Sequence, residues 1–280
     1  MIRIITDSAA DFEPKELEQL NITCIPLPVR FGQQEYQENI NLSKNEFYSL
    51  LLSCEDHPQT SQASPQILLD LFEDADKAGD EAVYFTLSSA LSGTYQSALI
   101  TRNLADSHRC HVLDSLNATG GQRLIVEYAA KLRDQGKTVP QIMEAVEDIR
   151  SRITLFACID TLEYLYKGGR ISQTVYKLGT LANIKPIITV EPDGSIGIPA
   201  KAMGMRKGMD YLCKQAESRP ADPDFPFYVM YTNNRSVAET LAAKLETAGI
   251  QVSEDHIIQV GAAIGSHIGP DACGLVYVAK

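Results

Sequence analysis

A turn rich in Ser and Thr carries the residues whose types and spacing best suit chemistry. In TLSSALSGTYQSA (86–98) a short apolar run ends, small residues follow, and an amphipathic segment opens at Ser92, Gly93 and Thr94. Free backbone N–H groups at a helix start, together with hydroxyl side chains, can bind an anionic head group. Ser92 could equally serve only as a helix N-cap, so this pattern leaves both roles open.

Two catalytic motifs do not match this turn. No Lys follows in the Gly-Lys-Ser/Thr order of a nucleotide P-loop, and no Gly-X-Ser-X-Gly elbow surrounds Ser92. A serine-type esterase that uses Ser92 and His267 is therefore an alternative hypothesis for which no third catalytic residue is identified.

A second group of hydroxyl side chains occupies TSQAS (60–64). Ser64 before Pro65 is typical of a helix N-cap followed by Pro in the first turn. Thr60, Ser61 and Gln62 have no obvious structural role, and Thr60 and Ser61 are candidate ligand-binding residues.

The C-terminal segment GAAIGSHIGP (261–270) contains one ionisable residue, His267, among regularly spaced glycines. The spacing predicts a tightly packed turn or short helix, in which His267 is either structural or functional. The five histidines and six widely spaced cysteines show no metal-ligand spacing, so no metal site is predicted. The cysteines are expected to be reduced thiols.

Strand-like runs alternate with helical patterns through the first 160 residues. Strands are predicted at 2–6, 24–29, 82–87, 110–114 and 153–159, and helices at 43–53, 65–78, 94–106, 119–135 and 140–151. This alternation indicates a mostly parallel sheet flanked by helices. Ligands bind beyond the carboxyl ends of parallel strands, so the polar residues there could share one crevice: Thr6-Asp7-Ser8, Ser88-Ser89 and Asp114-Ser115.

The remaining residues predict a smaller α/β unit with a mixed sheet. The expected elements are helices at 161–167, 172–182, 205–217 and 235–248, a hairpin of 184–190 with 195–202, and strands at 226–232, 256–261 and 274–280. We therefore predict two α/β domains, 1–160 and 161–280.

Composition indicates a soluble globular protein. The 280 residues are 44% hydrophobic and 22% charged, with a net charge of -11 that argues against binding nucleic acid through its phosphates. No apolar run is long enough to cross a bilayer, and Asp7 interrupts the segment where a secretory signal would lie. A cytoplasmic location with peripheral or no membrane contact is expected.

Charge is distributed unevenly along the chain. Residues 164–209 contain seven basic and two acidic residues, a net charge of +5 within an acidic protein. This basic segment is either a solvated face or a docking surface for an acidic partner or a phosphorylated ligand.

Together these motifs resemble the DegV family of bacterial fatty-acid-binding proteins, the carrier subunits of fatty acid kinase. The family commonly has Pro where this chain has Ala63, a difference that removes no hydroxyl. The matching segments, in family order, are ITDSAAD (5–11), TSQAS (60–64), SSALSGTYQSA (88–98), DTLEYLYKGGRIS (160–172), KPI (185–187) and IGSHIGP (264–270).

The resemblance implies two α/β domains and an acyl chain held in a buried tunnel at or near their interface, without catalysis by this chain alone. It implies that Thr60 and Ser92 bind the carboxylate, and that Arg170 and His267 contact the partner or the phosphate. Ser61, Gly93 and Thr94 are expected beside them.

The ligand implied by the resemblance is a long-chain fatty acid such as a C16 or C18 acid, with no other cofactor. The implied partner is a separate ATP-binding subunit related to dihydroxyacetone kinases, which would make the acyl phosphate. A sensor of another apolar small molecule is a further hypothesis that differs only in its cargo.

Overall fold

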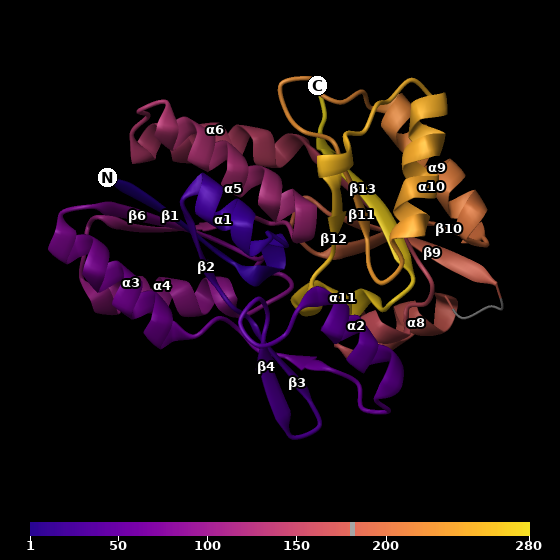
Figure 1. Cartoon of the computed structure of the whole chain (residues 1–280), viewed down its shortest axis with the longest axis horizontal. Helices are drawn as coiled ribbons and strands as arrows, with labels where there is room; N and C mark the ends of the chain where they lie inside the picture. The colour runs from indigo at the N-terminus through magenta and orange to yellow at the C-terminus, as the bar shows by residue number, and fades with distance from the viewer. Residues whose placement is uncertain (180–182) are drawn as a thin grey trace.

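Three β-sheets organise the chain, which the computed structural model describes for residues 1–179 and 183–280 (Figure 1). The strands are β1 (Ile2–Asp7), β2 (Ile22–Ile25), β3 (Pro28–Phe31), β4 (Gln34–Gln37), β5 (Gln59–Thr60), β6 (Glu81–Thr86), β7 (Cys110–Asp114), β8 (Ile153–Ile159), β9 (Ile184–Val190), β10 (Ile196–Met203), β11 (Tyr228–Tyr231), β12 (Ile257–Gln259) and β13 (Ala272–Val278).

Helices cover both large sheets. They are α1 (Pro14–Leu20), α2 (Lys44–Ser53), α3 (Pro65–Ala78), α4 (Thr94–Ala105), α5 (Thr119–Asp134), α6 (Val139–Arg152), α7 (Glu163–Lys167), α8 (Gln173–Gly179), α9 (Met205–Ser218), α10 (Arg235–Thr247) and α11 (Ala262–Ile268), with short 3-10 helices η1 (Ser8–Ala10) and η2 (Glu254–His256). The last predicted residues of the helix at 172–182 lie outside the described residues.

The first sheet has the order β2-β1-β6-β7 and is parallel throughout. Helices α3 and α4 lie on one side of it and α5 and α6 on the other (Figure 1). Helix α3 shows why: Leu68, Phe72 and Ala75 share one face at helical spacing and are buried. The Ser64 hydroxyl caps its first turn, as predicted.

The second sheet is mixed, with the order β10-β9-β8-β13-β11-β12. Only β11 and β12 pair in parallel; the other neighbours are antiparallel. Helices α9 and α10 cover its outer face, at the right of Figure 1. Helix α5 contacts strands of both large sheets, so it lies between them.

These observations confirm the predicted fold class of a parallel α/β unit and a mixed-sheet α/β unit. Strand β8 belongs to the second sheet, where it pairs with β9 and β13. The domain boundary predicted at residue 160 instead places this strand in the N-terminal domain. Among the described residues, no helix is both long enough and apolar enough to span a bilayer.

The prediction of one strand at 24–29 is wrong. The chain leaves the first sheet after Ile25, and β3 pairs instead with β4 and β5 in a small antiparallel sheet. Pro26 separates the two strands and lacks a backbone N–H for a continuous ladder. This small sheet brings Thr60 beside Val29, close to the candidate site.

Candidate ligand-binding site

An apolar cavity lies between the loops of the first sheet and the inner face of the second. Leu155 and Ala157 of β8, and Ile188 and Val190 of β9, line it at a spacing of two residues. Side chains alternate between the faces of a strand, so this spacing turns one face of the sheet into a cavity wall. Further apolar lining residues are Leu27, Leu87, Leu91, Ala118, Leu165, Ile196, Met230, Val260, Ala263, Ile264, Ile268 and Ala272.

Polar side chains from several parts of the chain border the same cavity. They include Thr60, Ser61, Ser92, Arg170 and His267, which were predicted from the sequence, with Gly93 beside Ser92; Gln62, Thr119 and Thr232 also line it. The segments around Thr60 and Ser92 pack tightly, since a Cβ atom on Gly93 would lie 2.8 Å from the Gln62 side-chain oxygen. The structure therefore brings the predicted head-group residues into one place.

Thr60 and His267 are joined directly. The distance between Thr60 Oγ1 and His267 Nε2 is 2.9 Å, which links β5 to α11 across 207 residues of sequence. Burial lowers the pKa of His267 to about 3, and the nearby charges of Arg170 and His57 act in the same direction. His267 is therefore a neutral imidazole at physiological pH, able to orient the Thr60 hydroxyl.

Ser92 lies just before α4, where it belongs to a hydroxyl pair. Its Oγ is 2.9 Å from Thr94 Oγ1 and accepts a hydrogen bond from the Thr94 backbone N–H. Thr94 is buried behind Ser92, does not line the cavity, and accepts a hydrogen bond from the Ala63 N–H. Gly93, not Ser92, occupies the N-cap position of α4. Thr94 is thus placed to orient Ser92 rather than to touch a ligand.

Arg170 reaches the Ser92 turn from the segment after α7. Its Nε and Nη2 atoms donate to the Leu91 carbonyl oxygen at 3.0 and 2.9 Å, and its Nη1 atom donates to the Gly168 carbonyl. Within residues 1–179 and 183–280 it forms no ion pair with a carboxylate. Burial lowers its pKa, but a guanidinium remains charged at any physiological pH. The polar end of the cavity therefore holds a cation without an acidic partner.

The esterase arrangement is not assembled. His267 contacts Thr60 rather than Ser92, and its buried Nδ1 atom has no hydrogen-bond partner among the residues that the structure describes. The described part of the chain also contains no group of three or more His, Cys, Asp or Glu side chains placed to hold a metal ion.

The aspartates at the strand ends serve the loops. Asp7 does not line the cavity; it is buried and accepts hydrogen bonds from Leu87 N, Ala9 N and Gln122 Nε2. Burial raises its pKa to about 6. Asp114 likewise accepts from the backbone N–H groups of Ser89 and Leu116. Both fix the turns that carry the site.

The cavity walls were not predicted from the sequence, nor were two polar lining residues, Thr119 at the start of α5 and Thr232 after β11. The apolar-rich runs at 153–159 and 184–190 predict buried strands, but they do not show which face of each strand borders a cavity.

Comparisons with known proteins agree with this geometry. The family model described as "Uncharacterised protein, DegV family" matches residues 1–280. A DegV domain-containing protein of Caldanaerobacter subterraneus is 32% identical over 280 residues, covering 100% of this chain and 99% of the relative.

Two solved structures share the fold. A fatty-acid-binding DegV family protein from Thermus thermophilus is 27% identical with a TM-score of 0.88, covering 100% of this chain and 99% of that one. A stearic acid-binding protein from Eubacterium ventriosum is 23% identical with a TM-score of 0.90 and the same coverage. The match along the whole chain confirms the resemblance found in the sequence motifs: this chain belongs to the DegV family.

Proposed function

We propose that this protein binds a long-chain fatty acid, such as a C16 or C18 acid, with its acyl chain in the cavity between the two large sheets. The observation that carries the proposal is an apolar cavity bordered by hydroxyl groups and by the guanidinium of Arg170, which forms no ion pair with a carboxylate among the described residues. The Eubacterium ventriosum protein of the same fold binds stearic acid. Burial of about fifteen methylenes at ~0.8 kcal/mol each would contribute ~12 kcal/mol before the costs of association.

The hydroxyls of Thr60 and Ser92 would hold the carboxyl group, with Ser61 and Gly93 beside them. Each hydroxyl already has a partner that fixes its direction, His267 for Thr60 and Thr94 for Ser92. Neutral donors orient a carboxylate without the strong ion pair that would oppose its later reaction. Arg170 adds a nearby positive charge that favours the ionised acid.

Replacing Ser92 by Ala is expected to lower the affinity for fatty acid by about tenfold or more, and with it the amount retained through purification, because a hydrogen bond to a charged group contributes about 1.5–3 kcal/mol. Mass spectrometry of lipid extracted from purified wild type and Ser92→Ala measures this. Ser89→Ala, in the same turn but outside the cavity lining, is the matched control. Equal occupancy in a folded Ser92→Ala variant contradicts the assigned head-group site.

The bound acid would be presented to a separate ATP-binding subunit related to dihydroxyacetone kinases. The resemblance suggests this partner, and the basic segment 164–209 would supply a contact surface for an acidic face. Arg170, a member of that segment, bonds the Leu91 carbonyl next to Ser92, and His267 bonds Thr60; both would then lie near the charge that develops on a phosphoryl group.

Arg170→Gln is expected to reduce acyl-phosphate formation by about a hundredfold, the scale seen when a preorganised donor to a developing charge is lost. The assay supplies ATP, the kinase subunit and fatty-acid-loaded carrier, and lipid extraction verifies that loading persists. Arg102→Gln, on α4 and outside the basic segment, is the control. Unchanged turnover, or association with the kinase that is insensitive to salt, contradicts the partner assignment.

A further inference from the structure

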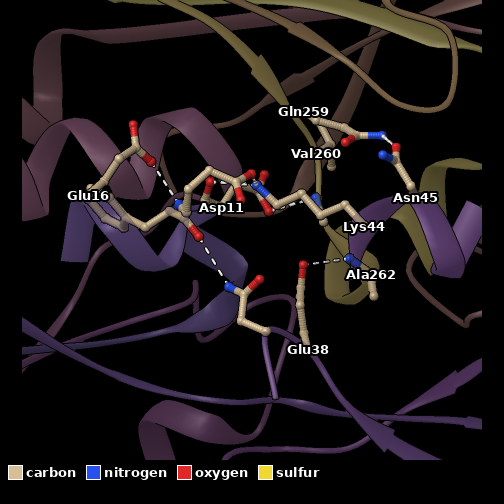
Figure 2. A network of polar contacts seen from close by, with 12 residues as sticks. Asp11, Glu16, Glu38, Lys44, Asn45, Gln259, Val260 and Ala262 are labelled. Carbon is tan, nitrogen blue, oxygen red and sulfur yellow. Dashed lines mark hydrogen bonds and ion pairs between the residues drawn. The ribbon is translucent and has the colours of Figure 1, made fainter. Parts of the chain in front are cut away.

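Two buried carboxylates hold the first turn of α11, the helix that carries His267. Gly261, Ala262 and Ala263 present backbone N–H groups that a helix cannot satisfy internally. Asp11 Oδ1 accepts from Gly261 N at 2.8 Å, while the two oxygens of Glu38 accept from Ala262 N and Ala263 N at 2.9 and 3.4 Å. Figure 2 shows Asp11 and Glu38 converging on this turn.

Gly261 packs tightly against both carboxylates. A Cβ atom on Gly261 would lie 1.7 Å from a Glu38 oxygen and 3.0 Å from an Asp11 oxygen. Tyr48 also bonds the preceding residue, its hydroxyl donating to the Val260 carbonyl at 2.9 Å. Asp11, Glu38 and Tyr48, all from the N-terminal part of the chain, thus hold the residues just before α11 and its first turn.

The same turn forms part of the cavity wall. Val260, Ala263, Ile264 and Ile268 line the cavity, and His267 follows on the same short helix. Asp11 also accepts a hydrogen bond from the Thr119 hydroxyl, which lines the cavity from α5. A displacement of the first turn would therefore move the apolar wall and the histidine that orients Thr60 together.

We propose that Glu38 is a positioning residue of the ligand site: its carboxylate sets the position of α11, and through α11 that of His267 and the cavity wall. The inference rests on the proposed function, since it assigns Glu38 a role in retaining the acyl ligand. Glu38 lies outside the cavity lining and acts only through the backbone of Ala262 and Ala263.

The charges around Glu38 make this hold sensitive to pH. Burial and the neighbouring Asp11 raise the pKa of Glu38 to about 7, against the opposing charge of Lys44. Burial also raises the pKa of Asp11 to about 6. Other titratable groups also face this cluster: Tyr48 on α2, Cys24 on β2, Arg123 on α5 and Glu13. Burial raises the pKa values of Tyr48 and Cys24, and Glu13 forms an ion pair with Lys44.

Protonation weakens the hold on the helix. A carboxylate accepts strongly from both N–H groups, whereas a carboxylic acid keeps only one good acceptor oxygen. Ligand affinity should therefore fall as pH drops through 7.

Global stability responds to pH in the opposite sense. Because folding raises the pKa of Glu38 to about 7, the contribution of Glu38 to the free energy of unfolding is fully present below the pKa of the unfolded chain. That contribution is lost as pH rises through about 7.

The test compares wild type, Glu38→Gln and the matched control Glu35→Gln, whose side chain is exposed on β4. Equilibrium dialysis with isotopically labelled oleic acid gives each dissociation constant at pH 8 and pH 5.5. Glu38→Gln is expected to bind about tenfold more weakly than wild type at pH 8 and within about twofold at pH 5.5, the difference reflecting loss of a charge-assisted bond. The ligand's own titration cancels in this ratio.

Thermal melts separate positioning from folding. Between pH 5.5 and pH 8 the melting temperature of Glu38→Gln should rise relative to that of wild type. Over the same range its affinity for oleic acid should fall relative to wild type. A ratio of affinities that is the same at both pH values overturns the role of Glu38, whereas failure of wild type to bind oleic acid would instead overturn the proposed function.

Wild type alone supplies a second measurement, should the variant not fold. Hydrogen exchange of the amides at 262–263, corrected for the intrinsic pH dependence, is expected to lose about tenfold protection between pH 8 and pH 5.5. Unchanged protection would show that the carboxylate does not hold α11 and would overturn the inference.

Discussion

Replacing Ala157 by Phe is expected to abolish the retention of long-chain fatty acid. Ala157 on β8 and Gly274 on β13 face each other in register, and both line the cavity. A Cβ atom on Gly274 would lie 2.9 Å from the Ala157 Cβ, so this pair of small residues leaves the space that the acyl chain would fill. A phenyl ring there would displace about four methylenes, an affinity loss of about 3 kcal/mol or a hundredfold.

The measurement is dialysis with labelled oleic acid, accompanied by a thermal melt that verifies folding. Ala157→Val provides a graded control, because two added methyl groups should reduce affinity by a smaller factor without filling the cavity. A folded Ala157→Phe variant that binds oleic acid as wild type does would show that the acyl chain lies elsewhere.

The loops that we propose bind the head group could be located from the sequence because their chemistry is local. Small hydroxyl residues next to a helix start or a strand end are visible in a sequence, and the family motifs added Arg170 and His267 to them. The packing of β5 and α11 then explains why Thr60 and His267 meet. Thr94 shows the limit of motif reasoning, since it supports Ser92 instead of lining the cavity.

The cavity walls and the hold on α11 could not be predicted in the same way. Successive side chains of β8 point to opposite faces of the sheet, but only the packing of the second sheet decides which face borders the cavity. Glu38 forms its contacts with Ala262 across 224 residues of sequence, and no spacing rule joins such positions. The small sheet escaped prediction because its strands span only two to four residues.

Arg123 joins the helices of the first sheet to a strand of the second. From α5 its Nε donates to Glu127 at 2.9 Å and its Nη1 to Glu16 of α1 at 3.0 Å. The guanidinium also lies over the rings of Phe12 and Tyr228, 4.6 and 5.1 Å from their centroids. The Tyr228 hydroxyl in turn donates to Glu127, so β11 and α5 share one buried charged cluster.

The Arg123→Met variant is expected to lose about 3–5 kcal/mol of stability, the cost of leaving a buried carboxylate without its partner. For a chain of this length that is a decrease of about 10 °C in melting temperature. Burial already raises the pKa of Glu127, with Arg123 opposing the shift. Without Arg123 the ionised form becomes costlier still, so the loss should be greatest at pH 8 and smaller at pH 5, where Glu127 can take a proton.

Adding Glu127→Gln to Arg123→Met should recover about half of the lost stability, because the uncompensated charge is then gone while the packing defect remains. Lys131→Met, an exposed position on the same helix, controls for removal of a positive charge. Thermal melts at pH 8 and pH 5 measure all four proteins. A loss of stability that is equal at both pH values, or unrelieved by Glu127→Gln, would contradict the assignment of an electrostatic cost to Glu127.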